Sequence, residues 1–219
     1  MKLANTNPLG YLSRPSSGNG KSILLLHAWW GLNDTAKQFC ENLASEGYTV
    51  FAPDLYHGKI ATTIPEAEQL RNELKQGEER AQAEVLAAAE YLLEQVEDGN
   101  HSVAAIGFSL GAGFALDCAF KLPDKIKAVV LYYGVGEAEF EKSTADYLGH
   151  FAENDEYEPK KWVDWLEDEL KKAGREVTFH TYPGTGHWFA EPDRVNEYNE
   201  ATAELAWNRT LVFLREKLS

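Results

Sequence analysis

The chain has 219 residues, which suits a single α/β domain whose core is large enough to fold without disulfides or a structural metal. Its 35 acidic and 21 basic residues give a formal net charge of −14, which disfavours binding to nucleic acid or to an anionic membrane surface. Residues 1–10 contain no apolar targeting segment, and no apolar run approaches the roughly 18 residues of a membrane span. We therefore expect a cytoplasmic protein that binds neither nucleic acid nor a membrane.

Short apolar runs alternate with longer segments of helical periodicity along the whole chain. The predicted strands cover residues 23–27, 48–52, 103–106, 128–133, 147–151 and 177–182. The predicted helices cover residues 36–45, 66–96 with a break near Gly77, 110–120, 160–173 and 198–217. This alternation is typical of a mostly parallel central sheet with helices on both faces. No repeat or linker-like stretch interrupts it, so we expect one domain over residues 1–219.

Several large or soft side chains in the predicted helices fit core positions. Trp162 and Trp165 recur with leucines at helical spacing, and so does Trp207 in the last helix. Cys40 and Cys118 both lie in apolar helical contexts. We predict that the tryptophans are core residues rather than ligand contacts, and that the two cysteines are buried thiols without a redox role.

The segment Gly107-Phe108-Ser109-Leu110-Gly111 joins a predicted buried strand to a predicted helix. A serine at so sharp a turn has a sparsely populated backbone conformation, and flanking glycines remove the side chains that would collide there. The turn exposes the hydroxyl beside the N-terminus of the helix, where an oxyanion is stabilised. Ser109 is therefore the predicted nucleophile.

A serine hydroxyl needs a base to take its proton, and the base needs a third group to orient it. In this architecture the order along the chain is serine, acid and then histidine, each in a loop at the carboxyl end of a strand. His187 follows the last predicted strand and a glycine-rich turn, so it is the predicted base, with His57 as a weaker second candidate. Asp155 is the predicted acid in the loop after the preceding strand, where Glu153 and Glu156 compete with it.

The tetrahedral intermediate of acyl transfer needs two backbone N–H donors. Leu110 N–H, directly after the nucleophile, is the first. The segment from His27 to Gly31 follows a strand and has H-x-x-x-G spacing. This spacing occurs in the first strand-to-helix loop of hydrolases that have a serine nucleophile at such a turn. By its position in this loop, Trp29 N–H is the predicted second donor.

Segments spread over residues 30–190 together resemble the dienelactone hydrolase family. They are Trp30-Gly31-Leu32-Asn33, Phe51-Ala52-Pro53-Asp54-Leu55-Tyr56, Gly107–Gly111, Tyr132-Tyr133-Gly134, Asp155 with Pro159, and the run from Tyr182 to Ala190. The resemblance implies an α/β-hydrolase fold without a large cap domain and a triad of Ser109, Asp155 and His187. It also implies hydrolysis of lactones or esters without a metal or cofactor.

The sequence departs from the family's pattern at three positions. Ser109 stands where the namesake enzymes have cysteine, and Ala28 where they have a glutamate near the nucleophile. The two changes agree, since a thiol needs help to control its ionisation and a serine activated by histidine does not. Glu191 replaces an arginine expected four residues after the histidine, which would hold a substrate carboxylate. Because a glutamate would repel a carboxylate, we predict a neutral ester or lactone as substrate.

Aromatic side chains near the predicted site could line an apolar substrate pocket, with Trp30 and Trp188 as the first candidates. The main hypothesis is a serine carboxylesterase or lactonase whose partner is a small molecule. The alternatives are a thioesterase or carbon–carbon bond hydrolase with the same triad, and a binding protein that has the fold without turnover. The sequence gives no indication of the oligomeric state.

Overall fold

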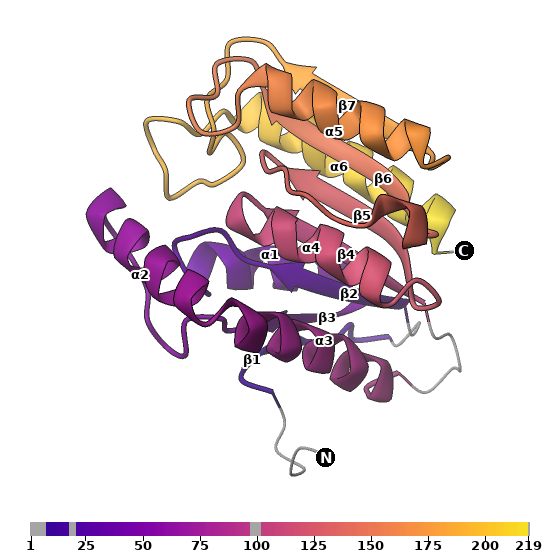
Figure 1. The fold of residues 1–219 in the computed structure, drawn as a ribbon. Helices are drawn as coiled ribbons and strands as arrows, with labels where there is room; N and C mark the ends of the chain where they lie inside the picture. The colour runs from indigo at the N-terminus through magenta and orange to yellow at the C-terminus, as the bar shows by residue number, and fades with distance from the viewer. Residues whose placement is uncertain (1–7, 18–20, 97–101, 219) are drawn as a thin grey trace. The chain divides into compact units, whose positions relative to one another are not determined.

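The computed structural model describes residues 8–17, 21–96 and 102–218 (Figure 1). They form two compact units. The first unit contains the described residues up to Leu25 and from Trp29 to residue 96, and the second contains Leu26–Ala28 and the described residues from Ser102 onward. Among the described residues, no helix is both long and apolar enough to cross a membrane.

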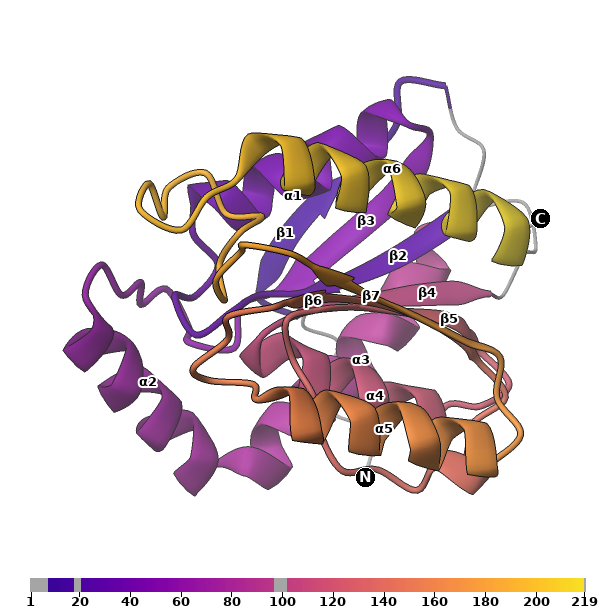
Figure 2. The same ribbon diagram turned by 90° about the horizontal axis from the view of Figure 1, so that it is seen from above.

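The first unit contains three strands, β1 (Gly10–Ser13), β2 (Lys21–Leu26) and β3 (Tyr48–Pro53), in the order β1-β3-β2. Strands β2 and β3 are parallel, with Ile23 opposite Val50, and β1 pairs with β3 in the antiparallel direction. The helices are α1 (Asp34–Ser45), α2 (Ile64–Gln76) and α3 (Glu78–Glu94). Figure 2 shows α1 and α3 on opposite faces of these strands.

The second unit contains four parallel strands, β4 (Val103–Phe108), β5 (Ile126–Tyr132), β6 (Asp146–Ala152) and β7 (Val177–Tyr182), side by side in chain order. The helices are α4 (Leu110–Lys121), α5 (Lys160–Lys172) and α6 (Glu200–Lys217), with a short 3₁₀ turn, η1 (Phe140–Lys142). Figure 2 shows α4 and α5 on one face of these strands and α6 on the other. The predicted alternation of parallel strands and helices on both faces is therefore confirmed.

A buried polar network joins the strands of the second unit to α6. The ring nitrogens of His150 in β6 lie 2.8 Å from the Tyr182 hydroxyl and 3.0 Å from Thr210 Oγ1. The Tyr132 hydroxyl lies 2.9 Å from the same threonine oxygen. His150 is fully buried, and this burial holds the pKa of its imidazole well below its usual value, so the ring is neutral and both nitrogens are paired. The network satisfies polar groups that would otherwise be costly to bury.

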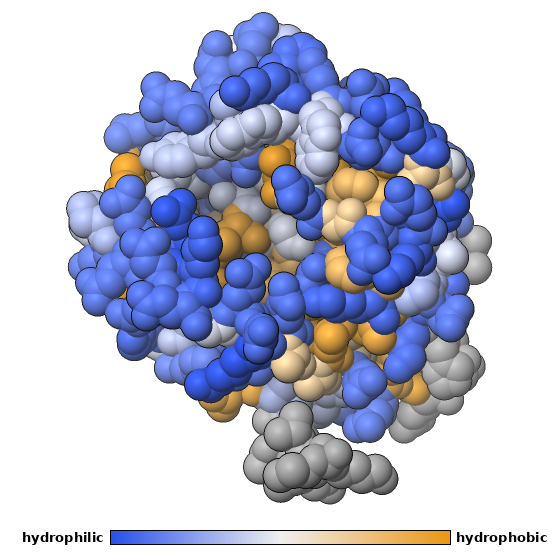
Figure 3. Space-filling view, in the orientation of Figure 1, coloured by the Kyte–Doolittle hydropathy of each residue, from blue (hydrophilic) through white to orange (hydrophobic). Residues whose placement is uncertain are grey.

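The prediction that Trp162 and Trp165 are core residues is wrong, because these side chains are 46% and 38% exposed. The buried face of α5 is formed by Val163, Leu166 and Leu170, so the two tryptophans lie at its borders. Figure 3 shows hydrophobic side chains scattered among a majority of hydrophilic ones on one face of the molecule. Single exposed apolar side chains of this kind are normal for a protein surface.

Candidate active site

Ser109 lies between β4 and α4 in a strained turn, with φ of 49° and ψ of −114°. A non-glycine residue in this region stores strain on the order of 1–3 kcal/mol, which the surroundings must compensate. A Cβ on Gly107 would lie 2.6 Å from the Ala112 Cα, and a Cβ on Gly111 would lie 2.8 Å from the His27 carbonyl oxygen. Glycine is therefore required at both positions by close backbone approach, as the sequence predicts.

In the predicted triad, His187 lies within hydrogen-bond distance of both Ser109 and Asp155. Ser109 Oγ lies 2.8 Å from His187 Nε2, and His187 Nδ1 lies 2.8 Å and 2.9 Å from the two carboxylate oxygens of Asp155. The histidine and aspartate side chains are 4% and 3% exposed. With its proton on Nδ1, the imidazole donates to the carboxylate and accepts from the serine hydroxyl. This is the geometry that a serine nucleophile requires.

Backbone N–H groups fix the Asp155 carboxylate in its loop after β6. Oδ1 accepts hydrogen bonds from the N–H groups of Tyr157 and Glu158, at 2.9 Å and 2.8 Å. The competing candidate Glu153 has a different place, because its carboxylate accepts from Gly184 N–H at 2.9 Å. Glu156 is exposed. Of the three acids in this loop, Asp155 is the one that contacts the histidine.

Aromatic rings surround the His187 imidazole. The ring centroids of Tyr157, Tyr133 and Trp188 lie 5.0 Å, 5.1 Å and 5.4 Å from that of the histidine. Trp188 is buried against the Tyr157 ring as well, so much of its surface packs within the protein. These rings restrict the orientation of the imidazole, and contact between Trp188 and a substrate stays a prediction.

Leu110 is the first residue of α4, so its N–H is among those that have no partner within the helix. Trp29 and Trp30 lie in the first unit, in the loop that follows β2, where their rings pack edge to face at 5.5 Å and are almost completely buried. Leu26 and His27, which precede this turn, approach Gly111 in the first turn of α4 with their carbonyl groups. The roles of Leu110 and Trp29 as oxyanion donors, and of Trp30 in substrate binding, stay predictions.

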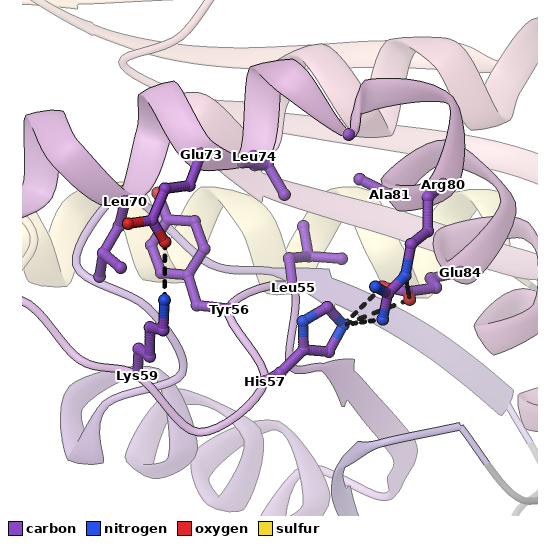
Figure 4. A pocket seen from close by; sticks show the side chains of 11 residues that line it. Leu55, Tyr56, His57, Lys59, Leu70, Glu73, Leu74, Arg80, Ala81 and Glu84 are labelled. Carbon is purple, nitrogen blue, oxygen red and sulfur yellow. Dashed lines mark hydrogen bonds and ion pairs between the residues drawn. The ribbon is translucent and has the colours of Figure 1, made fainter.

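The first unit contains a pocket of about 190 Å³ between α2, α3 and the loop after β3 (Figure 4). Two pairs of polar side chains lie at its edges: Lys59 Nζ is 2.7 Å from a Glu73 carboxylate oxygen, and His57 Nε2 is 3.0 Å from one of Glu84. In His57, the second candidate for the base, one ring nitrogen is therefore paired with the Glu84 carboxylate.

Glu191 has a different role from the one that the sequence suggests. Its side chain is buried, and its Oε1 accepts a hydrogen bond of 2.9 Å from the Tyr133 hydroxyl. Burial raises the pKa of Glu191 to about 8, so the group is mostly neutral at pH 7. The expectation that its charge repels a substrate carboxylate is therefore wrong. The missing arginine alone remains as a reason to predict a neutral substrate.

Glu158 is a second acidic residue near the triad, which sequence reasoning missed. Burial raises the pKa of its carboxyl to about 8, with the Asp155 charge acting in the same direction. Its only sequence signal is its place three residues after Asp155, which does not distinguish it from its acidic neighbours. Within the described ranges, no group of three or more histidine, cysteine or acidic residues is placed to hold a metal ion.

Comparison with known proteins agrees with this fold. The model of the Dienelactone hydrolase family matches residues 9–218. Protein usf of Aquifex pyrophilus is 30% identical over 217 residues, which cover 96% of this chain and 94% of that protein. A carboxymethylenebutenolidase of Rhodococcus opacus is 26% identical, with 98% and 88% covered.

Among solved structures, a dienelactone hydrolase-like promiscuous phosphotriesterase from metagenomic libraries has the same fold. Its TM-score is 0.81 at 20% identity, and the match covers 92% of this chain and 88% of that chain. The family match extends over nearly all the described residues of both units. The chain therefore belongs to the dienelactone hydrolase family of α/β hydrolases, enzymes that act on ester and lactone bonds.

Proposed function

We propose that the protein hydrolyses a small carboxylic ester or lactone through a covalent acyl-enzyme on Ser109. The observation that carries the proposal is the hydrogen-bonded chain from the Ser109 hydroxyl through His187 to Asp155, with 2.8 Å at each step. A serine hydroxyl is a weak nucleophile alone, and a neighbouring imidazole that is oriented by a carboxylate activates it.

In the first half-reaction, Ser109 Oγ attacks the acyl carbon while its proton passes to Nε2 of His187. Asp155 keeps the other ring proton on Nδ1 and stabilises the imidazolium. Nε2 then gives its proton to the alkoxide as the ester C–O bond breaks. In the second half-reaction, a water molecule loses a proton to Nε2 and attacks the acyl carbon, and the proton returns to Oγ as the carboxylic acid leaves.

The negative charge of each tetrahedral intermediate is held by the N–H of Leu110 and the N–H of Trp29. One such donor typically contributes about 2.7–4 kcal/mol of transition-state stabilisation. The position of Leu110 at the N-terminus of α4 supports its role, because the helix dipole favours an anion there.

The preferred substrate is a neutral ester or lactone that places its apolar part against Trp30 and Trp188. This follows from the absence of an arginine at position 191, because no guanidinium is available there to pair with a carboxylate. The printed name of the Rhodococcus opacus relative, carboxymethylenebutenolidase, supports a lactone as one member of the substrate class. A cytoplasmic location, one functional domain and independence of metal and cofactor stay predictions from the sequence.

Steady-state kinetics on short-chain p-nitrophenyl esters, five- and six-membered lactones and matched thioesters test this proposal. We expect the highest kcat/KM for a neutral ester or lactone, and a loss of at least about 10³-fold in the Ser109→Ala and His187→Ala variants. A thioester that exceeds its oxygen ester by more than tenfold would favour a thioesterase. Tight binding of these compounds without turnover would favour a binding protein and contradict the proposal.

A further inference from the structure

A buried carboxyl–phenol pair joins the two segments that carry the proposed nucleophile and base. Glu191 is 5% exposed and Tyr133 is fully buried, and their side chains share a hydrogen bond of 2.9 Å. In the proposed mechanism neither residue donates or accepts a proton. Burying a polar pair costs free energy unless its hydrogen bonds are made. We therefore expect a pair in this position, beside the triad, to have a function.

Tyr133 is attached to the backbone around Ser109. It directly follows β5 with a positive φ of 38°, and its N–H donates to the His150 carbonyl at 2.7 Å. The preceding carbonyl, of Tyr132, accepts from Ser109 N–H at 2.9 Å. On the other side, a Cβ on Gly134 would lie 3.0 Å from the Ser109 carbonyl carbon. The backbone of residues 132–134 therefore lies directly against that of the nucleophile.

Glu191 is attached to the segment of His187. Consecutive turns run from Gly186 to Glu191, with Phe189 N–H donating to the Gly186 carbonyl and Glu191 N–H to the Trp188 carbonyl. The Tyr133 ring lies against the His187 ring at 5.1 Å. The phenol therefore supports the imidazole with its face and holds the end of the same segment with its hydroxyl.

We propose that the Tyr133–Glu191 hydrogen bond is a brace that holds the His187 imidazole against the Ser109 hydroxyl. The proposal rests on the proposed function, because it requires Ser109 and His187 to be the reacting pair. Tyr133 and Glu191 are then positioning residues, which act on kcat rather than on substrate binding.

The surroundings of the pair keep both side chains protonated near neutral pH. Burial is the largest influence on Glu191 and raises its pKa to about 8; Asp193 acts in the same direction, whereas Arg194 and the Tyr133 hydrogen bond lower it. Arg194 itself pairs with Asp193 at 2.6 Å. The Tyr133 phenol has the rings of Tyr132 and His187 on its other sides, and it remains protonated because burial raises its own pKa well above 10.

A carboxylate accepts a hydrogen bond at least as well as a carboxyl group, so the brace does not depend on the protonation of Glu191. Removal of the bond frees the end of the His187 segment, and the imidazole loses part of its support. Proton transfer between Oγ and Nε2 depends on their separation, so kcat should fall while KM changes little when the bond is removed.

The test is the measurement of kcat and KM near neutral pH, with a neutral p-nitrophenyl ester corrected for spontaneous hydrolysis. The variants are Glu191→Gln, which keeps an acceptor for the Tyr133 hydroxyl but does not ionise, and Tyr133→Phe, which removes the bond and keeps the ring. Glu158→Gln is the matched control, because Glu158 has a similarly raised pKa and lies near Asp155.

We expect Tyr133→Phe to lower kcat roughly tenfold with KM nearly unchanged, and Glu191→Gln, which keeps the bond, to stay within about threefold of the wild type. Glu158→Gln should also stay within about threefold. The brace is overturned if Tyr133→Phe keeps the wild-type kcat, if its loss appears in KM instead, or if Glu158→Gln loses as much activity as Tyr133→Phe. A wild type that hydrolyses no ester overturns the proposed function as well, whereas an active enzyme whose kcat is independent of the Tyr133 hydroxyl overturns the brace alone.

Discussion

Replacing Gly111 with alanine tests how the turn around Ser109 is built. A Cβ at this position would lie 2.6 Å from the Leu26 carbonyl carbon and 2.8 Å from the His27 carbonyl oxygen. Favourable contacts between carbon atoms lie at about 3.5–4.0 Å, so the methyl group must push the start of α4 and the chain after β2 apart by roughly 1 Å. Both neighbours are backbone atoms, which no side-chain rotation can move away.

Over-packing of this kind costs about 1–3 kcal/mol of folding free energy. The effect on kcat should be greater than the effect on stability, because a displacement of about 1 Å at a reacting group lowers the rate by about 10²-fold. Since Gly111 lies two residues from Ser109, the displaced atoms include the N–H groups proposed to hold the oxyanion. We therefore expect Gly111→Ala to lose about 1–3 kcal/mol of stability and about 10²-fold in kcat.

Gly113→Ala is the matched control in the same helix, because a Cβ there meets no atom within 4 Å. Alanine is a better helix former than glycine by about 1 kcal/mol, so this variant should be slightly more stable than the wild type and fully active. Urea unfolding gives the free energies, and p-nitrophenyl acetate hydrolysis gives kcat. If the two alanine variants behave alike in either assay, the close approach at Gly111 does not determine the geometry of the turn.

Three further predictions concern the second unit. Asp155→Asn should keep the fold, because the amide oxygen can accept the same backbone N–H groups, but should lower kcat by about 10³–10⁴-fold; turnover within tenfold of the wild type would refute the role of the carboxylate. The pKa of Glu191 is about 8 in the folded protein and 4.5 for the free group. Its contribution to the free energy of unfolding is therefore complete below about pH 4.5 and is lost as the pH rises to about 8, by at most about 1.4 kcal/mol per pH unit. The difference in unfolding free energy between wild type and Glu191→Gln should fall with this slope, and a difference that is constant over this range contradicts the raised pKa. His150→Phe should cost about 1–3 kcal/mol in chemical denaturation, because it leaves the buried hydroxyl groups of Tyr182 and Thr210 with one partner fewer, whereas the half-exposed His180→Phe should cost less than about 1 kcal/mol.

The sequence predicted β4, β5 and β6 because each is a largely apolar run, as is typical of a parallel sheet. It predicted β7 because that segment consists mostly of β-branched and aromatic residues. The strand Gly10–Ser13 was missed. It has four residues and pairs through its backbone at one side of β3, so it has neither the length nor the apolar pattern of the others. Helical spacing predicted that α5 has one buried face, but it does not determine which residues lie at the edge of that face. Trp162 and Trp165 were therefore predicted to be buried, although both side chains are exposed.

The residues of the proposed triad could be identified because chain order and turn chemistry restrict them strongly. Ser109 is marked by its glycines, and His187 by the turn Pro183-Gly184-Thr185-Gly186 that follows β7. The protonation of Glu191 could not be predicted in the same way. It depends on complete burial and on the Tyr133 hydroxyl, which is 58 residues away in the chain, and neither is visible in local sequence.

The central claim is that the Ser109 hydroxyl is an activated nucleophile. Treatment with a fluorophosphonate, followed by intact-mass measurement and peptide mapping, tests it without knowledge of the substrate. We predict a single covalent adduct on Ser109, no adduct in Ser109→Ala, and labelling slowed by orders of magnitude in His187→Ala. A wild-type protein that stays unmodified under conditions that label other serine hydrolases, or that is labelled at a different residue, would contradict the claim.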